Sequence, residues 1–119
     1  MKNFKYKTQP PGSKLCGQVV LSMITGISIH YICNDLKNRN ATRNKELIMY
    51  LECNNIKTLY KRCSDFNKVP NKSIVKIKFN NENTHWVFYY NGLFYDPDIG
   101  IIKSYNDEWI KCVSYIKLK

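Results

Sequence analysis

The stretch QPPGSKLCGQVVLSMITG, residues 9–26, decides how the rest of the chain is interpreted. Its first part is rich in Pro, Gly and Ser, which are residues typical of a loop. Its second part is apolar on nearly every side, as in a short helix that is buried all round. Gly26 lies where such a helix would end in the left-handed conformation. The stretch therefore predicts a loop that leads, at Cys16, into a buried helix.

Cys16 is expected at the amino end of this helix. The aligned peptide dipoles favour negative charge there, which suits a thiolate nucleophile. A free cysteine is also often just a small buried hydrophobic residue, and the stretch by itself leaves this alternative open.

The composition is that of one globular domain covering residues 1–119. Apolar residues make up 44% of the chain, so a modest core can form and disorder is not indicated. The five cysteines are odd in number, and their spacing fits neither a disulfide framework nor a zinc site. We therefore expect no metal, no cofactor and a reduced cytoplasmic location, which would be the host-cell cytoplasm for a viral chain.

The termini and the net charge say less about the location and the binding partners of the protein. No apolar run follows the lysines at the amino terminus, so neither a signal peptide nor a membrane span is expected. A net charge of +10 is compatible with an acidic protein or a nucleic acid as partner. The lysines are scattered, however, and abundant Lys with Asn is what an AT-rich viral or bacterial genome would encode. A solvated surface is favoured over a specific nucleic-acid site.

The first half of the chain is predicted to be helical after an arm or short strand at residues 1–8. Ser28 can cap a second helix, whose apolar stripe at positions 29, 32, 33 and 36 puts Cys33 in the core. His30 lies off this stripe and is expected to be exposed. A third helix is expected from about residue 43 to 54, capped by Thr42 or Asn44.

The second half changes to the period of β-strands. Strands are expected at about residues 56–63, 75–79, 85–90, 93–95, 101–102 and 112–118, with a helical turn at 107–111. The strand at 75–79 alternates with lysines and is predicted to be half-exposed, whereas 85–90 is continuously apolar and predicted to be central. Asn91-Gly92 predicts a two-residue type I′ turn. Helices followed by an antiparallel sheet indicate the α+β class.

A cysteine nucleophile needs a base, and His85 is the better placed of the two histidines. It begins a buried strand directly after a polar turn, so its ring can reach the edge of the sheet. A structural strand histidine is the alternative.

Two carboxylates are candidates to orient His85. With a two-residue turn, His85 pairs with Asp98, and Asp96 is the diagonal neighbour on the same face. A carboxylate at this point can fix the tautomer of the imidazole. A bulge would shift the register by one, so pairing leaves both residues open. For the transition state, the backbone N–H of Cys16 and the side-chain amide of Gln9 are candidate oxyanion donors.

These residues carry a resemblance to a known family. The segments Gln9…Cys16-Gly17, Thr84-His85-Trp86-Val87 and Asp96-Pro97, in this order, resemble the papain-like cysteine peptidase superfamily. More narrowly, the chain is similar to the small bacteriocin-processing, double-glycine-type peptidases. The resemblance covers roughly Gln9 to Gly100 and implies a papain-like fold, in which the helix that carries the nucleophile packs on the carboxy-terminal antiparallel sheet.

The resemblance also implies roles for individual residues. Cys16 would be the nucleophile, His85 the base, Asp96 the orienting carboxylate and Gln9 the oxyanion donor. The chain departs from the family at two points. Gln9 lies seven residues before the cysteine rather than the usual six, and the connection between His85 and Asp96 is shorter than usual.

The predicted function is that of a thiol hydrolase acting on a protein or peptide. Cys16 would attack a peptide or isopeptide carbonyl and form a thioester, a first half that is shared with acyl transfer and deamidation. The alternative is a papain-like scaffold without catalysis, whose basic surface binds an acidic protein or a nucleic acid.

Overall fold

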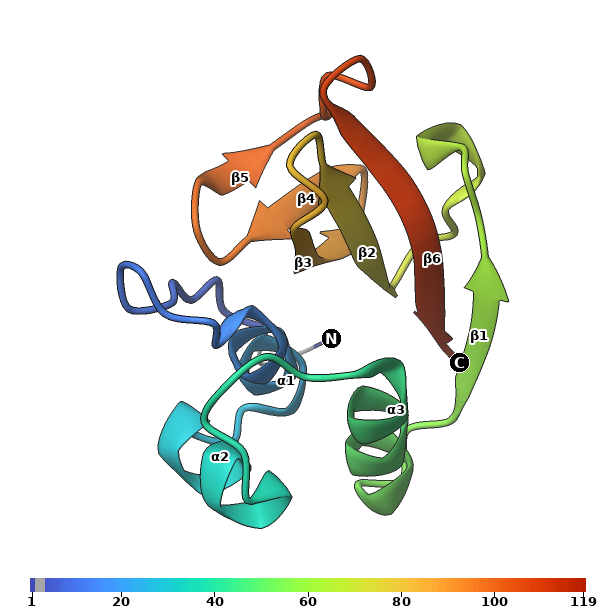
Figure 1. Ribbon diagram of the computed structural model, residues 1–119. Helices are drawn as coiled ribbons and strands as arrows, with labels where there is room; N and C mark the ends of the chain where they lie inside the picture. Colours follow the sequence, from blue (N-terminus) through green and yellow to red (C-terminus); the bar gives the residue numbers. More distant parts are fainter. Residues whose placement is uncertain (2–3) are drawn as a thin grey trace.

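The computed structural model describes residue 1 and residues 4–119, in which three helices are followed by a six-stranded antiparallel sheet (Figure 1). The helices are α1 (Cys16–Thr25), α2 (Ile29–Leu36) and α3 (Asn44–Cys53). The strands are β1 (Thr58–Arg62), β2 (Ser73–Phe79), β3 (Thr84–Tyr90), β4 (Leu93–Asp96), β5 (Gly100–Ile102) and β6 (Ile110–Leu118), with a 3-10 helix η1 (Phe66–Lys68) after β1. The spatial order of the strands is β1-β6-β2-β3-β4-β5. The predicted α+β class is confirmed.

Helix α1 is the buried centre of the helical layer. It begins at Cys16, and every residue from Cys16 to Met23 is buried. It ends at Thr25, and the next residue, Gly26, has a φ of 76° and donates its N–H to the Ser22 carbonyl over 2.9 Å. A left-handed residue of this kind favours glycine, because a Cβ would be strained there. The predicted loop-to-helix transition at Cys16 is confirmed.

Helix α2 follows its predicted pattern. Ser28 caps it by accepting a hydrogen bond from the Tyr31 N–H. Cys33 is buried in the core and His30 is exposed, as the apolar stripe predicts.

Helix α3 has the predicted extent but a different cap. Its N-cap is Arg43, rather than Thr42 or Asn44, and the Glu46 carboxylate accepts the Arg43 N–H over 3.0 Å. Thr42 is unavailable because it is buried against the sheet, where its carbonyl accepts a hydrogen bond from Trp86 Nε1 over 3.2 Å.

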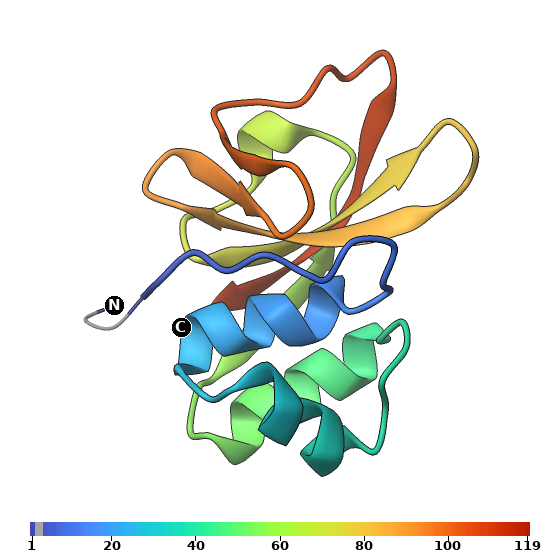
Figure 2. The same ribbon diagram turned by 90° about the vertical axis from the view of Figure 1, so that its left-hand side faces the viewer.

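Both faces of the sheet are covered (Figure 2). The three helices lie on one face, where their apolar side chains pack against Ile74, Trp86, Phe88, Ile116 and Leu118. The other face is covered by η1 and the connection between β5 and β6, and it contributes Val75, Ile77, Val87, Phe94, Cys112 and Tyr115. The prediction that β3 is central is confirmed.

Strand β2 differs from its prediction as a half-exposed strand. It lies between β6 and β3, and Ile74 is fully buried under the helices. Lys76 is tolerated on this face because its ammonium group lies 5.6 Å from the centre of the Trp86 ring. The lysine alternation therefore reflects long side chains that reach past the core, and not an open face.

The β3–β4 hairpin has the predicted turn. Asn91 and Gly92 both have positive φ, 51° and 84°, and Tyr90 pairs with Leu93. Positive φ at both central residues is the signature of the type I′ turn, whose twist matches that of the flanking strands.

Strand β6 begins two residues earlier than predicted, at Ile110. A helical turn was expected at 107–111, but the chain makes only a turn over 107–109 before it enters the strand. The N–H groups of Trp109 and Ile110 both donate to the Asn106 carbonyl.

Residues 4–15, which precede α1, form an arm and not a strand (Figure 2). Of the expected segment 1–8, residues 2 and 3 lie outside the described residues. The Phe4 ring packs on Phe88, Tyr90 and Tyr95, with ring centres 4.8 to 5.4 Å apart. These contacts fix the arm along the boundary between helices and sheet.

In the described part of the chain, no single helix is both long and apolar enough to cross a membrane. Helices α1 and α2 reach that length only together, across a bend of 115°.

Candidate active site

Three of the sequence-predicted residues, Cys16, His85 and Asp96, come together where α1 packs against β3. Gly17 makes the close packing of α1 possible. A Cβ at Gly17 would overlap Thr42 Oγ1 and lie 3.2 Å from Trp86 Cδ1. The glycine after the cysteine therefore allows the first turn of α1 to approach β3, next to His85.

His85 and Asp96 form a buried hydrogen-bonded pair. His85 Nε2 lies 2.6 Å from Asp96 Oδ1, and the two residues are 8% and 1% exposed. Asp96 is thus the carboxylate in contact with the ring. Asp98, the alternative that pairing left open, has an exposed side chain and contributes only its backbone N–H, which donates to Asp96 Oδ1 over 2.9 Å.

The Asp96 carboxylate is held by a third donor that sequence reasoning missed. The Tyr105 hydroxyl donates to Asp96 Oδ2 over 2.7 Å, and both groups are buried. The Tyr6 hydroxyl, from the arm, donates to the backbone carbonyl of Asp96. Neither tyrosine has a spacing that links it to the site. The only available signal is that a buried carboxylate needs hydrogen-bond donors.

The pair is ionised at neutral pH. Burial would lower the pKa of His85, but hydrogen bonding to Asp96 and to Cys16 outweighs it and raises this pKa from 6.5 to about 10. Burial would raise the pKa of Asp96, but the hydrogen bonds from His85, Asp98 and Tyr105 and the charge of His85 hold it below its ordinary 3.8. His85 is therefore an imidazolium opposite a carboxylate.

The orientation of the ring follows from this pair. Because Nε2 is engaged by Asp96, Nδ1 is the nitrogen left to interact with Cys16. Cys16 is 8% exposed and begins α1, and it is one of the neighbours that raise the pKa of His85.

Gln9 is anchored beside the site by its backbone. Its N–H donates to the Pro97 carbonyl over 2.9 Å, directly after Asp96. The following loop contains a turn in which the Ser13 N–H donates to the Pro10 carbonyl and Gly12 has a φ of 73°. Pro at the second position and Gly at the third are the requirements of a type II turn. This turn lies between Gln9 and Cys16, the connection that is one residue longer than in the family that the sequence resembles.

The Gln9 side chain is turned toward its own loop. Its Nε2 donates to the Ser13 carbonyl over 2.8 Å, which commits one of the two amide protons. Its Oε1 is buried and has no hydrogen-bond partner among the described residues.

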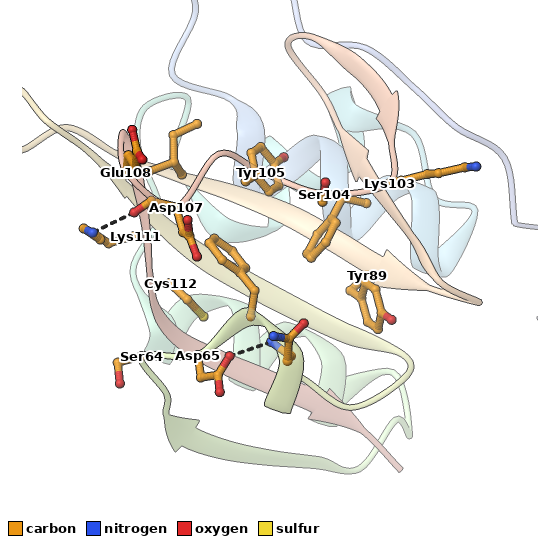
Figure 3. Close-up of a pocket in the computed structure, with 14 residues that line it drawn as sticks. Ser64, Asp65, Tyr89, Lys103, Ser104, Tyr105, Asp107, Glu108, Lys111 and Cys112 are labelled. Atoms are coloured by element: carbon orange, nitrogen blue, oxygen red, sulfur yellow. Dashed lines mark hydrogen bonds between the residues drawn. The ribbon is translucent and has the colours of Figure 1, made fainter.

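A cavity of about 680 Å³ lies on the face of the sheet away from the helices (Figure 3). Tyr105 lines it, but Cys16 and His85 do not. Tyr105 therefore borders the cavity while its hydroxyl holds Asp96.

Models of known protein families give no match to this chain, and neither do curated proteins.

Proposed function

We propose that this chain is a cysteine hydrolase with a papain-like catalytic arrangement. One observation carries the proposal: the His85 ring is hydrogen-bonded to buried Asp96 over 2.6 Å, and Cys16, at the start of a helix, also interacts with this ring and raises its pKa. This is the nucleophile, base and orienting carboxylate that thiol catalysis requires.

In the proposed acylation step, the Cys16 thiolate attacks the carbonyl carbon of a peptide or isopeptide bond. The π electrons of the carbonyl move to its oxygen and give a tetrahedral oxyanion. When this intermediate collapses, the C–N bond breaks and the leaving amine takes the proton from His85 Nδ1. A thioester on Cys16 and a neutral His85 remain.

In the proposed deacylation step, neutral His85 removes a proton from water as the water attacks the thioester. The carboxylic acid leaves, the Cys16 thiolate is restored and His85 is again an imidazolium. Asp96 keeps its charge throughout and stabilises both orientation and charge of the ring. An amine in place of water would give acyl transfer, and a side-chain amide as substrate would give deamidation.

The oxyanion would be stabilised by two donors. The backbone N–H of Cys16, in the first turn of α1, has no partner inside the helix and points out of its amino end. The second donor would be the Nε2 proton of Gln9 that Ser13 does not bind.

Selective alkylation tests the proposal. Iodoacetamide is added below saturation, and modification at each of the five cysteines is measured by fragmentation mass spectrometry of tryptic peptides, which separates Cys16 from Cys33 within peptide 15–37. We expect Cys16 to react faster than the other four, including exposed Cys53, because it faces the imidazolium. His85→Gln should remove this preference, whereas Cys53→Ser should leave it unchanged. Faster labelling of Cys53 than Cys16 in the wild type would overturn the proposal.

The second candidate function is a binding module without catalysis, and the Gln9 side chain favours it. Its bond to the Ser13 carbonyl turns one oxyanion donor toward the loop. With a net charge of +10, such a module would bind an acidic protein or a nucleic acid. This function predicts salt-sensitive binding to DNA or RNA that is the same in the wild type and in Cys16→Ser.

A further inference from the structure

Two other cysteines, Cys63 and Cys112, lie side by side across the boundary between β1 and β6. Cys63 directly follows β1, and its N–H donates to the Val113 carbonyl over 3.1 Å, which continues the pairing of the two strands. Its sulfur is 3.2 Å from the Asp65 carbonyl oxygen, to which it donates. Cys112 is in β6, opposite Ile77 of β2.

A bulge in β6 turns Cys112 toward Cys63. The pairing of β2 with β6 passes from Lys76↔Ser114 to Ile77↔Cys112, so Val113 is the extra residue. Without this residue, regular alternation from Tyr115 would direct Cys112 toward the helices. With it, Cys112 joins Tyr115 in the cluster on the opposite face, against which Cys63 packs.

The two sulfurs share one environment. Both cysteines line a cavity of about 430 Å³ together with Arg62, Lys78 and Lys111. Cys112 is 6% exposed, and its pKa is raised to about 12, first by burial and then by the neighbouring Cys63 thiol. Figure 3 shows Cys112 next to the segment of Ser64 and Asp65 that follows Cys63. Cys63 is the more exposed of the two.

We propose that Cys63 and Cys112 are a reversible oxidation site that closes into an intramolecular disulfide, with a small anionic disulfide such as oxidised glutathione as the oxidant. The site lies on the opposite face of the sheet from the helices, and its existence does not depend on the chemistry of Cys16.

The reaction has two exchange steps. The Cys63 thiolate attacks one sulfur of the glutathione disulfide, which breaks the S–S bond and releases one glutathione thiolate. Cys112 then loses its proton and attacks the Cys63 sulfur of the mixed disulfide, which releases the second glutathione. The protein gives up two electrons and two protons, and the glutathione disulfide is reduced to two thiols.

The surroundings of the two cysteines favour an anionic oxidant and a first reaction at Cys63. Arg62, Lys78 and Lys111 line the cavity and outnumber the acidic residues beside it, which are Glu82, in an ion pair with Lys78 over 3.1 Å, and Asp65, so the cavity presents positive charge to an oxidant that carries carboxylates. Buried Cys112 remains a thiol, so the accessible Cys63 meets the oxidant first.

The test uses the sequence around the pair. Trypsin cuts after Arg62, Lys68, Lys111 and Lys117, so the two cysteines fall in separate short peptides, residues 63–68 and 112–117. The folded protein is equilibrated with mixtures of reduced and oxidised glutathione, free thiols are alkylated, and peptides are analysed by mass spectrometry. We expect a cross-linked pair of these peptides, lighter than their sum by two hydrogens, which disappears when the mixture is made reducing.

Variants distinguish the steps. Cys112→Ser should keep glutathione on Cys63, because the resolving thiol is missing, and Cys63→Ser should form no cross-link. Cys53→Ser, at an exposed position in α3, should form the cross-link like the wild type. If Cys53 becomes glutathionylated while peptides 63–68 and 112–117 stay unlinked in the wild type, the proposal is overturned.

Discussion

At the scale of single residues, Asp96 is the point where the candidate site is held together. Its two carboxylate oxygens receive hydrogen bonds from His85, the Asp98 N–H and the Tyr105 hydroxyl. A carboxylate that is 1% exposed loses its hydration, and these donors replace it. The charge of Asp96 in turn keeps His85 protonated. His85 and Asp96 therefore stabilise each other's charge. Loss of one hydrogen-bond donor to Asp96 should also affect the His85 ring.

Tyr105→Phe tests this dependence. The phenylalanine ring can fill the same space, stacked on Phe66 as Tyr105 is, but Asp96 Oδ2 loses its donor. We expect a loss of about 1–3 kcal/mol in the free energy of unfolding by urea, the usual penalty for a buried acceptor without a partner. Tyr60→Phe, at an exposed position of β1, should change it by less than about 0.5 kcal/mol. Equal effects of the two substitutions would contradict the role of Tyr105.

Several of these residues were predictable from the sequence because their signals are local. A loop that becomes an apolar helix indicates Cys16, and a histidine at the start of an apolar strand indicates His85. Strand pairing could not choose between Asp96 and Asp98, because regular β3–β4 pairing ends at Phe88↔Tyr95 and the chain then turns. Only the resemblance indicated Asp96. Tyr105 was not predictable either, since it lies in an irregular segment whose path depends on the tertiary structure.

At the scale of elements, the packing of α1 on β3 brings the cysteine to the histidine. Gly17 is the residue that permits it, because Thr42 and the Trp86 ring occupy the space where a side chain would be. Thr42 is fixed there by the hydrogen bond from Trp86 to its carbonyl. Three parts of the chain therefore pack together at one point: the first turn of α1, the segment that leads into α3, and strand β3.

Gly17→Ala should destabilise the protein even though alanine is the better helix former. The added methyl group overlaps Thr42 Oγ1, and we expect a loss of about 1–3 kcal/mol in urea unfolding. In Thr42→Ala the overlapping hydroxyl is absent. Adding Gly17→Ala to that variant should therefore cost less stability than adding it to the wild type. Lys45→Ala, exposed on α3, is the control and should change stability by less than about 0.5 kcal/mol. A stabilised Gly17→Ala would contradict this packing.

The elements themselves were largely predictable because their patterns are local. Helix stripes, the Asn91-Gly92 turn and apolar strand runs all follow from neighbouring residues. The bulge at Val113 and the interior position of β2 were not predictable, because both depend on which strands become neighbours. The Arg43 cap was missed for a similar reason, since Thr42 is withdrawn by a tertiary contact with Trp86.

At the scale of the whole molecule, the buried ion pair should make stability depend on pH. The pKa of His85 is about 10 in the folded protein and 6.5 ordinarily, so its contribution is complete below pH 6.5 and is lost as the pH rises toward 10. The pKa of Asp96 is lowered from 3.8, so its contribution is present above that pH and is lost as the pH falls below it. Together they favour the folded state between these limits.

Urea unfolding at pH 6.5 and at pH 10 measures this contribution. The wild type should lose more stability over this interval than His85→Gln, because the glutamine does not titrate. Both proteins share all other titrating groups, so the difference isolates His85. Equal losses in the two proteins would show that the ring carries no extra proton in the folded state.

The most direct test of the central claim, that Cys16, His85 and Asp96 act as one charged unit, is a pH titration of the imidazole resonances by NMR. The chain has two histidines, and the spectrum of His30→Gln identifies the signals of His85. We predict that His85 titrates near pH 10 in the wild type, and at lower pH in both Asp96→Asn and Cys16→Ser. A wild-type His85 that titrates near its ordinary 6.5, and does so equally in both variants, would contradict the claim.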